Sequence, residues 1–180
     1  MNITVYLGSS TGNDPAYAQA ARELGTWIGS NGHRLVYGGS QVGLMGMLAD
    51  AVLEAGGQVT GVEPRFMIEV ELQHDSIDEL IMVETMAERM TKMIELGDAF
   101  VALPGGVGTL EEISEVASRI RLNLTQAPCV FCNVKGYYDD FIRYLDRMCD
   151  DGFIRPHERE AIVFANSIDE VAAAVGCSSS

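Results

Sequence analysis

Residues 99–112 read AFVALPGGVGTLEE, and the pattern of this stretch indicates the fold class of the chain most clearly. It opens with a short apolar run at 99–103, turns through three glycines, and continues into a helical pattern at 110–122. A short apolar run that is followed by a glycine turn and a helix is typical of a buried strand in a parallel sheet. The stretch therefore predicts a strand–loop–helix unit whose loop lies at the carboxyl edge of the sheet.

The same alternation of short strands and longer helices extends over the whole chain. Asp14 before Pro15 marks a helix start, and the glycines at 56 and 57 mark a helix end. We expect one α/β domain at 1–176, with a doubly wound parallel sheet of six to seven strands flanked by helices, and a frayed tail at 177–180. The expected strands are 3–7, 35–37, 58–62, 80–83, 99–103 and 130–134, and the expected helices are 15–30, 44–55, 86–96, 110–122, 138–150 and 168–175.

Glycine-rich loops follow three of these strands: GSSTG at 8–12, GGSQVGLMG at 38–46 and PGGVGT at 104–109. Each loop leads into a helix, whose first N–H groups have no acceptor within the helix and attract an anion. A Walker A motif is excluded because neither Lys92 nor Lys135 lies in such a loop. Glu111 occupies the third glycine position of a dinucleotide fingerprint, where its carboxylate would repel a bound pyrophosphate. We therefore expect a monophosphate ligand, with neither NAD nor FAD.

The composition excludes several classes of partner and site. The chain has 12 basic and 26 acidic residues, and its net charge of −14 repels nucleic acid and anionic membranes. We find no signal-peptide pattern and no run of about 18 apolar residues, so we expect a cytoplasmic protein that does not span a membrane. Cys129 and Cys132 form one C-x-x-C without a second ligand pair, and the three histidines are scattered. We therefore predict reduced thiols and no metal.

Two neighbouring glutamates and one arginine are the candidate catalytic residues. Successive helical residues differ by about 100°, so only one of Glu111 and Glu112 can face a ligand. Arg89 falls between Met86 and Met93 on one helical face, and a cation in such an apolar stripe needs an anion. Simpler alternatives remain open: the glutamates stabilise a helix start after a tight turn, and the arginine extends past the methionines into solvent.

Four motifs, GSSTGNDPAY, VYGGSQVGLMG, MAERMTKM and ALPGGVGTLEE, together resemble the LONELY GUY (LOG) family. Its members are cytokinin riboside 5′-monophosphate phosphoribohydrolases, often mislabelled lysine decarboxylases. The resemblance covers residues 3–138, with the family pattern P-G-G-x-G-T-x-x-E on 104–112 and the family's helix arginine on Arg89. It implies a modified Rossmann fold, a homodimer, no cofactor, and catalysis by Arg89 and Glu112.

The resemblance further implies cleavage of the N-glycosidic bond of purine nucleoside 5′-monophosphates, which releases ribose 5-phosphate and the free base, a cytokinin or adenine. A broad AMP nucleosidase and a non-catalytic nucleotide or molybdenum-cofactor carrier are the alternatives. The chain departs from the family pattern at Ser40, Met90 and 119–128, and we expect base contacts from these regions and the loop 63–78. The preferred base therefore stays open, as does the choice between hormone production and nucleotide salvage. The expected substrate contacts are Ser9, Ser10, Gly38, Gly39, Met86, Gly105, Gly106, Val107, Gly108 and Thr109.

Overall fold

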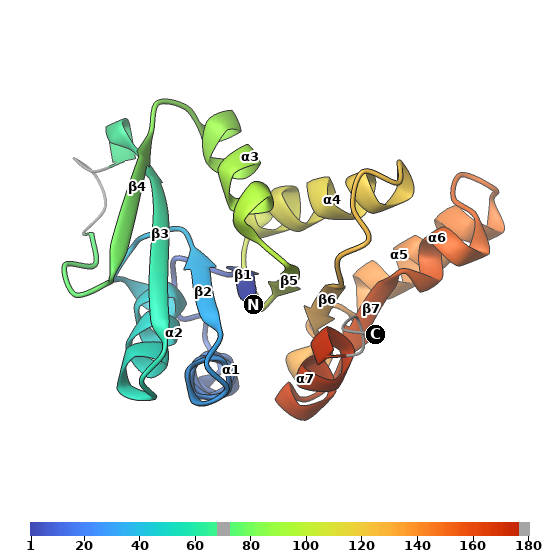
Figure 1. Cartoon of the computed structure of the whole chain (residues 1–180). Helices are drawn as coiled ribbons and strands as arrows, with labels where there is room; N and C mark the ends of the chain where they lie inside the picture. The colour runs from blue at the N-terminus through green and yellow to red at the C-terminus, as the bar shows by residue number, and fades with distance from the viewer. Residues whose placement is uncertain (68–72, 177–180) are drawn as a thin grey trace.

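Seven strands form one parallel sheet in the computed structural model, which describes residues 1–67 and 73–176. Their order is β4-β3-β2-β1-β5-β6-β7, with β1 near the middle (Figure 1). This arrangement confirms the predicted doubly wound sheet. The strands are β1 Asn2–Tyr6, β2 Arg34–Tyr37, β3 Gln58–Pro64, β4 Glu79–Val83, β5 Ala99–Ala102, β6 Cys129–Cys132 and β7 Ile162–Ala165.

Helices cover both faces of the sheet. The helices are α1 Pro15–Ser30, α2 Gly43–Glu54, α3 Met86–Leu96, α4 Val107–Arg121, α5 Asp139–Asp150, α6 Pro156–Glu160 and α7 Ile168–Gly176, with short 3₁₀ turns η1 Arg65–Met67 and η2 Val134–Gly136. α1, α2 and α7 pack against one face, and α3, α4 and α5 pack against the other. Helix α1 begins as predicted, since the Asp14 carboxylate accepts a hydrogen bond from the Ala16 N–H at 2.9 Å. No helix in the described part of the chain is long and apolar enough to cross a membrane.

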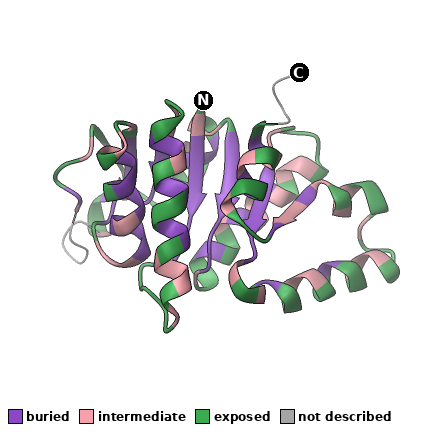
Figure 2. Ribbon diagram, turned by 90° about the horizontal axis from the view of Figure 1, so that it is seen from below, coloured by how far each residue is buried: buried purple, intermediate pink, exposed green. Residues whose placement is uncertain are grey.

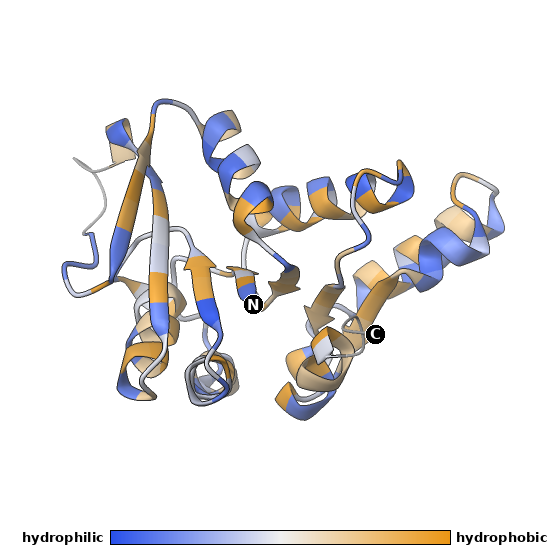
Figure 3. Ribbon diagram, in the orientation of Figure 1, coloured by the Kyte–Doolittle hydropathy of each residue, from blue (hydrophilic) through white to orange (hydrophobic). Residues whose placement is uncertain are grey.

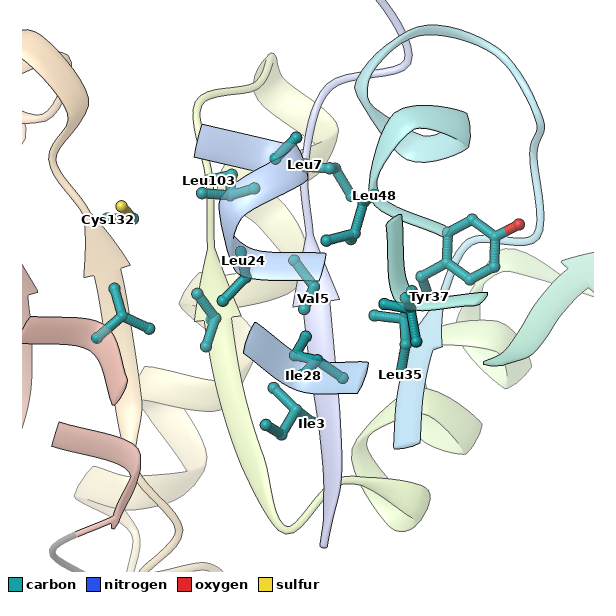
Figure 4. Close-up of a cluster of buried hydrophobic side chains, with 14 of the residues drawn as sticks. Ile3, Val5, Leu7, Leu24, Ile28, Leu35, Tyr37, Leu48, Leu103 and Cys132 are labelled. Atoms are coloured by element: carbon teal, nitrogen blue, oxygen red, sulfur yellow. The ribbon is translucent and has the colours of Figure 1, made fainter. Parts of the chain in front are cut away.

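The strand residues alternate between two buried clusters, one on each face of the sheet. On β1, Ile3 and Val5 point toward α1 and α2, whereas Tyr6 points toward α3 and α4. The central strands are buried, the edge strand β4 is partly exposed, and the outer faces of the helices are exposed (Figure 2). The helices are two-sided in hydropathy (Figure 3), and their apolar sides contribute side chains such as Leu24 of α1 and Leu48 of α2 to the buried cluster (Figure 4). Burial on both faces is the arrangement that a parallel sheet requires.

Some element boundaries differ from the predicted ones. The helix expected at 110–122 begins earlier, at Val107, because Gly106 is its N-cap and the second half of the glycine loop is already helical. The strand expected at 130–134 ends at Cys132, since the Asn133 side chain then accepts the Tyr138 N–H at 2.6 Å and starts a turn. Strand β7 and helix α6 lie in a region where we expect neither. β7 has only four residues, and pairing with β6 determines its conformation. The expected frayed tail lies outside the described residues.

The order of the strands creates a crevice beside β1. From β1 the chain proceeds through β2, β3 and β4 on one side, and β5 then returns to pair with the other edge of β1. The loops after β1 and β5 therefore lead to helices on opposite faces, α1 and α4. Ligands of doubly wound sheets bind at such a switch point, beyond the carboxyl ends of the strands.

Candidate active site

A cleft of about 290 Å³ lies at this switch point. Gly8 and Ser9 after β1, Gly38 after β2, and residues 106–109 at the start of α4 form its walls. Side chains of α3 close it from the same face of the sheet as α4. The cleft therefore combines all three glycine-rich loops with the two helices that carry the candidate catalytic residues.

Helix α3 holds Arg89 in the interior. The Thr85 hydroxyl caps the helix by accepting the Glu88 N–H at 3.1 Å, and Met93 anchors its apolar side in the core. Arg89 is only 9% exposed, and its Nε donates a hydrogen bond to the Val62 carbonyl at 3.1 Å. Its Nη1 lies 3.6 Å from Oε1 of Glu112. The apolar stripe in the sequence thus contains a buried cation that faces a carboxylate, and the interpretation as a solvated surface arginine is wrong.

Glycine at position 38 leaves the space that the Arg89 side chain needs. A Cβ atom built on Gly38 would lie 2.2 Å from Nη2 of Arg89 and 3.0 Å from Sδ of Met45. The first distance is far below any van der Waals contact, so any larger residue would displace the guanidinium group. This requirement accounts for the first glycine of the GGSQVGLMG loop.

Glu112 is the more buried glutamate of the pair, but Glu111 also borders the cleft, so the expectation that only one of the two can face a ligand is wrong. Glu112 lies one turn into α4 with its side chain 14% exposed, and its neighbour Glu111 is exposed. Burial raises the pKa of the Glu112 carboxyl, the Arg89 guanidinium lowers this pKa, and the Glu111 carboxylate raises it. The site therefore holds a carboxylate whose charge is costly in its surroundings and is stabilised mainly by one arginine.

The loops after β1 and β5 touch each other at the floor of the cleft. The Gly8 N–H donates a hydrogen bond to the Pro104 carbonyl at 3.2 Å. A Cβ atom on Gly105 would lie 2.1 Å from Oγ1 of Thr109 and 2.8 Å from the Gly8 nitrogen, so position 105 has room only for glycine. The Tyr137 hydroxyl donates to the Gly105 carbonyl at 2.5 Å and holds the loop from outside. These contacts fix the first N–H groups of α4 at the edge of the cleft, where they can bind an anion.

Most of the predicted site residues line this one cleft. Gly39 instead lies against Glu63 and Leu80. Ser10 and Gly105 line an adjoining hollow of about 220 Å³ that shares Gly8 and Gly106 with the cleft. The predicted residues that line the cleft itself are Ser9, Gly38, Met86, Arg89, Gly106, Val107, Gly108, Thr109 and Glu112.

Eight further lining residues are absent from the predicted set: Val5, Tyr6, Leu7, Gly8, Met45, Met67, Met93 and Glu111. Met45 belongs to the buried core, and its side chain also reaches the cleft. Tyr6 carries one usable signal, because it is the last residue of the first strand and strand ends meet at the ligand edge. The loop expected at 63–78 contributes Met67, and its middle part lies outside the described residues.

The described part of the chain contains no group of three or more His, Cys, Asp or Glu side chains that could hold a metal ion. The two lysines of the chain are also remote from the cleft lining. Lys92 pairs with Glu95 at 3.6 Å, and Lys135 pairs with Asp14 at 2.5 Å. Because pyridoxal phosphate is bound through a lysine, these residues do not fit that cofactor.

The chain is similar to several known proteins. A family model described as "Possible lysine decarboxylase" matches residues 45–175. A cytokinin riboside 5′-monophosphate phosphoribohydrolase of Rhodococcoides fascians is 42% identical over 175 residues, which cover 97% of this chain and 88% of the relative. Another, from Arabidopsis thaliana, is 40% identical over 169 residues, which cover 94% of this chain and 74% of the relative.

Solved structures share the fold. The molybdenum cofactor binding protein from Rippkaea orientalis matches with a TM-score of 0.75 at 19% identity, over 99% of this chain and 97% of that one. The Moco carrier protein from Chlamydomonas reinhardtii matches with a TM-score of 0.73 at 23% identity, over 98% and 95% of the two chains. At these identities the likeness extends to the fold alone.

The electrostatic coupling between α3 and α4 can be tested directly. We predict that Arg89→Gln raises the pKa of Glu112 further, because the variant loses the cation that lowers this pKa. A ¹³C NMR titration of the glutamate carboxyl carbons measures the change. Arg119→Gln is the matched control, since Arg119 pairs with Glu115 at 2.8 Å, and it should leave the Glu112 pKa unchanged. An unchanged or lowered Glu112 pKa in Arg89→Gln would contradict the pairing.

Proposed function

This chain belongs to the LOG family, and we propose that it hydrolyses the N-glycosidic bond of purine nucleoside 5′-monophosphates, with or without an N6 substituent. The products are the free base, a cytokinin or adenine, and ribose 5-phosphate. The observation that carries the proposal is the buried pair of Arg89 and Glu112 beside the N-terminus of α4. A carboxylate that faces a phosphate-binding helix end is suited to act on the sugar of a nucleotide.

Glu112 performs the central chemical role. Cleavage of an N-glycosidic bond passes through an oxocarbenium-like transition state, in which positive charge develops on the ribose. The Glu112 carboxylate stabilises this charge and orients the attacking water. Its raised pKa brings it closer to the range in which it can accept a proton from that water. Arg89 keeps the carboxylate ionised, positions the nucleotide and assists the departure of the base.

The phosphate group binds at a distance from the bond that breaks. The N–H groups of Gly108 and Thr109 lie in the first turn of α4, and the Thr109 hydroxyl is next to them. Binding energy from the phosphate therefore holds the ribose against Glu112, which raises the rate of the chemical step as well as the affinity. This proposal requires no cofactor.

Two other functions fit parts of the structure less well. A nucleotide or molybdenum-cofactor carrier would use the same loops, but passive binding of a phosphate gains nothing from a buried carboxylate whose charge is costly. A broad AMP nucleosidase would use the same catalytic pair and would differ only in its base preference. Lysine decarboxylation lacks support, because neither Lys92 nor Lys135 lines the cleft.

The substrate class is tested by separating the products of AMP, isopentenyl-AMP and the two corresponding nucleosides. We predict that both monophosphates are cleaved to base and ribose 5-phosphate. The nucleosides should show a kcat/KM at least about 100-fold lower, since each hydrogen bond to a charged group is worth about 1.5–3 kcal/mol. The ratio of the rates for AMP and isopentenyl-AMP separates a broad nucleosidase from a cytokinin-forming enzyme. Equal cleavage of nucleosides and monophosphates would contradict the proposal.

The role of Glu112 is tested by Glu112→Gln, which keeps the shape of the side chain and removes its charge. We predict that kcat falls by about 100-fold or more, while calorimetry shows nearly unchanged binding of AMP. Glu111→Gln is the matched control on the adjacent, exposed residue, and it should reduce kcat much less. A Glu112→Gln variant that turns over at the wild-type rate would show that another group is responsible for catalysis.

We also propose a cytoplasmic homodimer that binds no nucleic acid. Val107, Leu110, Leu122 and Leu124 are exposed along α4 and directly after it, and an exposed apolar surface of this kind is suited to a symmetric interface. The described cysteines are free thiols, as in a reducing compartment. In this proposal the two cysteines of the C-x-x-C, Cys129 and Cys132, stay reduced, as the sequence predicts.

Assembly is tested by light scattering together with activity at increasing dilution. We predict a dimer at micromolar concentration. The specific activity should fall when the protein is diluted below the dissociation constant of the dimer. Leu122→Glu should weaken the dimer, because it places a charge in the apolar surface, and Tyr144→Glu, at an exposed site on α5, serves as control. A fully active wild-type monomer at nanomolar concentration would contradict the dimer.

A further inference from the structure

Tyr6 occupies a particular place at the end of the central strand. It is the last residue of β1, and its side chain points to the face covered by α3 and α4. Its side chain also lines the cleft that contains Arg89 and Glu112, although the residue is only 1% exposed. The strand therefore directs one phenol group into the space beneath the two catalytic residues.

The Tyr6 hydroxyl is buried, and no group among the described residues forms a hydrogen bond with it. Buried hydroxyl groups are normally paired, so one without a partner at a ligand cleft calls for an explanation. The ionisable groups that influence it are Glu112 and Arg119 of α4, Arg89 of α3 and Cys129 of β6. Burial raises the pKa of Tyr6 far above its usual value, and Glu112 raises this pKa further. The phenol therefore stays protonated and can serve as a hydrogen-bond donor.

The Glu112 carboxylate is an acceptor with unused capacity. Its contact with Arg89 is 3.6 Å long, which exceeds the length of a hydrogen bond, and no described residue donates a hydrogen bond to it. An ionised carboxylate can accept several hydrogen bonds. A buried donor and an incompletely bonded acceptor thus line the same cleft, close enough for Glu112 to influence the Tyr6 phenol electrostatically.

We propose that Tyr6 is a positioning residue, whose hydroxyl donates a hydrogen bond to the Glu112 carboxylate when ribose 5-phosphate or the nucleotide occupies the cleft. This role rests on the proposed hydrolase function. The bond holds one carboxylate oxygen at the protein side and leaves the other free to face the sugar. It also favours the ionised form of Glu112, which is the form that stabilises positive charge on the ribose.

Tyr37 offers a matched comparison within the same sheet. It is also the last residue of a strand, β2, it is fully buried, and its hydroxyl also has no hydrogen-bond partner among the described residues. It belongs to the opposite cluster, however, with Leu35 and Leu48 (Figure 4), and it does not line the cleft. Removal of either hydroxyl leaves a phenylalanine of nearly the same shape, so only the location of the lost oxygen differs.

The experiment compares Tyr6→Phe, Tyr37→Phe and the wild type with AMP as substrate over a range of pH. We expect Tyr6→Phe to fold normally and to lower kcat about tenfold at neutral pH, with little change in KM. The acidic limb of its kcat profile should move to higher pH, because Glu112 loses a donor that favours its ionised form. A ¹³C NMR titration with ribose 5-phosphate present should show a raised Glu112 pKa in Tyr6→Phe. Tyr37→Phe should match the wild type in each measurement.

Three outcomes would overturn the proposal. They are a Tyr6→Phe variant with wild-type kcat and pH profile, an effect on KM alone, and an unchanged Glu112 pKa in the NMR titration. A wild-type protein that releases no base contradicts the proposed hydrolase function instead. The NMR comparison of Tyr6→Phe with the wild type then still decides whether the hydrogen bond exists, because it does not depend on turnover.

Discussion

A guanidinium group inside a protein needs an anion and hydrogen-bond acceptors, and the burial of Arg89 imposes this requirement on everything around it. The Val62 carbonyl of β3 accepts from its Nε, Gly38 after β2 leaves room for its planar head, and Glu112 of α4 supplies the negative charge. Four separate segments of the chain are thereby held in one geometry. The carboxylate that we propose as catalytic is a partner in this arrangement, so the proposed chemistry and the local packing depend on the same ion pair.

The proposed anion site explains how a strongly acidic protein would bind a phosphate. The net charge of −14 repels anions at long range, and salt screens that repulsion at distances beyond about 10 Å. Close to the cleft, the N-terminus of α4 and its unpaired N–H groups act over a few ångströms, where their geometry is fixed by the contact between Gly105 and Thr109. In the proposed site, local dipoles therefore outweigh the overall charge.

Much of the fold could be predicted because strands and helices differ in length and period along the chain. The same was not true of β7, since IVFA is too short to show a pattern and its conformation depends on β6. The start of α4 was missed because glycines usually indicate a loop, and here three of them precede or begin a helix. Within the candidate site, Arg89 and Glu112 could be predicted from their helical spacing and from the family motif. The strand-end position of Tyr6 was visible in the sequence, but the role proposed for it was not, because that role lies in a hydroxyl whose surroundings only the packed structure defines.

The position of β1 has a consequence for the synthesis of the protein. In the register of the central strands, Ile3 pairs with Leu35 on one side and with Ala99 on the other. During translation, one edge of β1 therefore stays unpaired until the ribosome has released the chain beyond β5. Until then the nascent chain presents an apolar strand edge that other chains can pair with. The strand order that creates the cleft thus also prolongs the period in which the newborn chain is prone to aggregate and has most to gain from a chaperone.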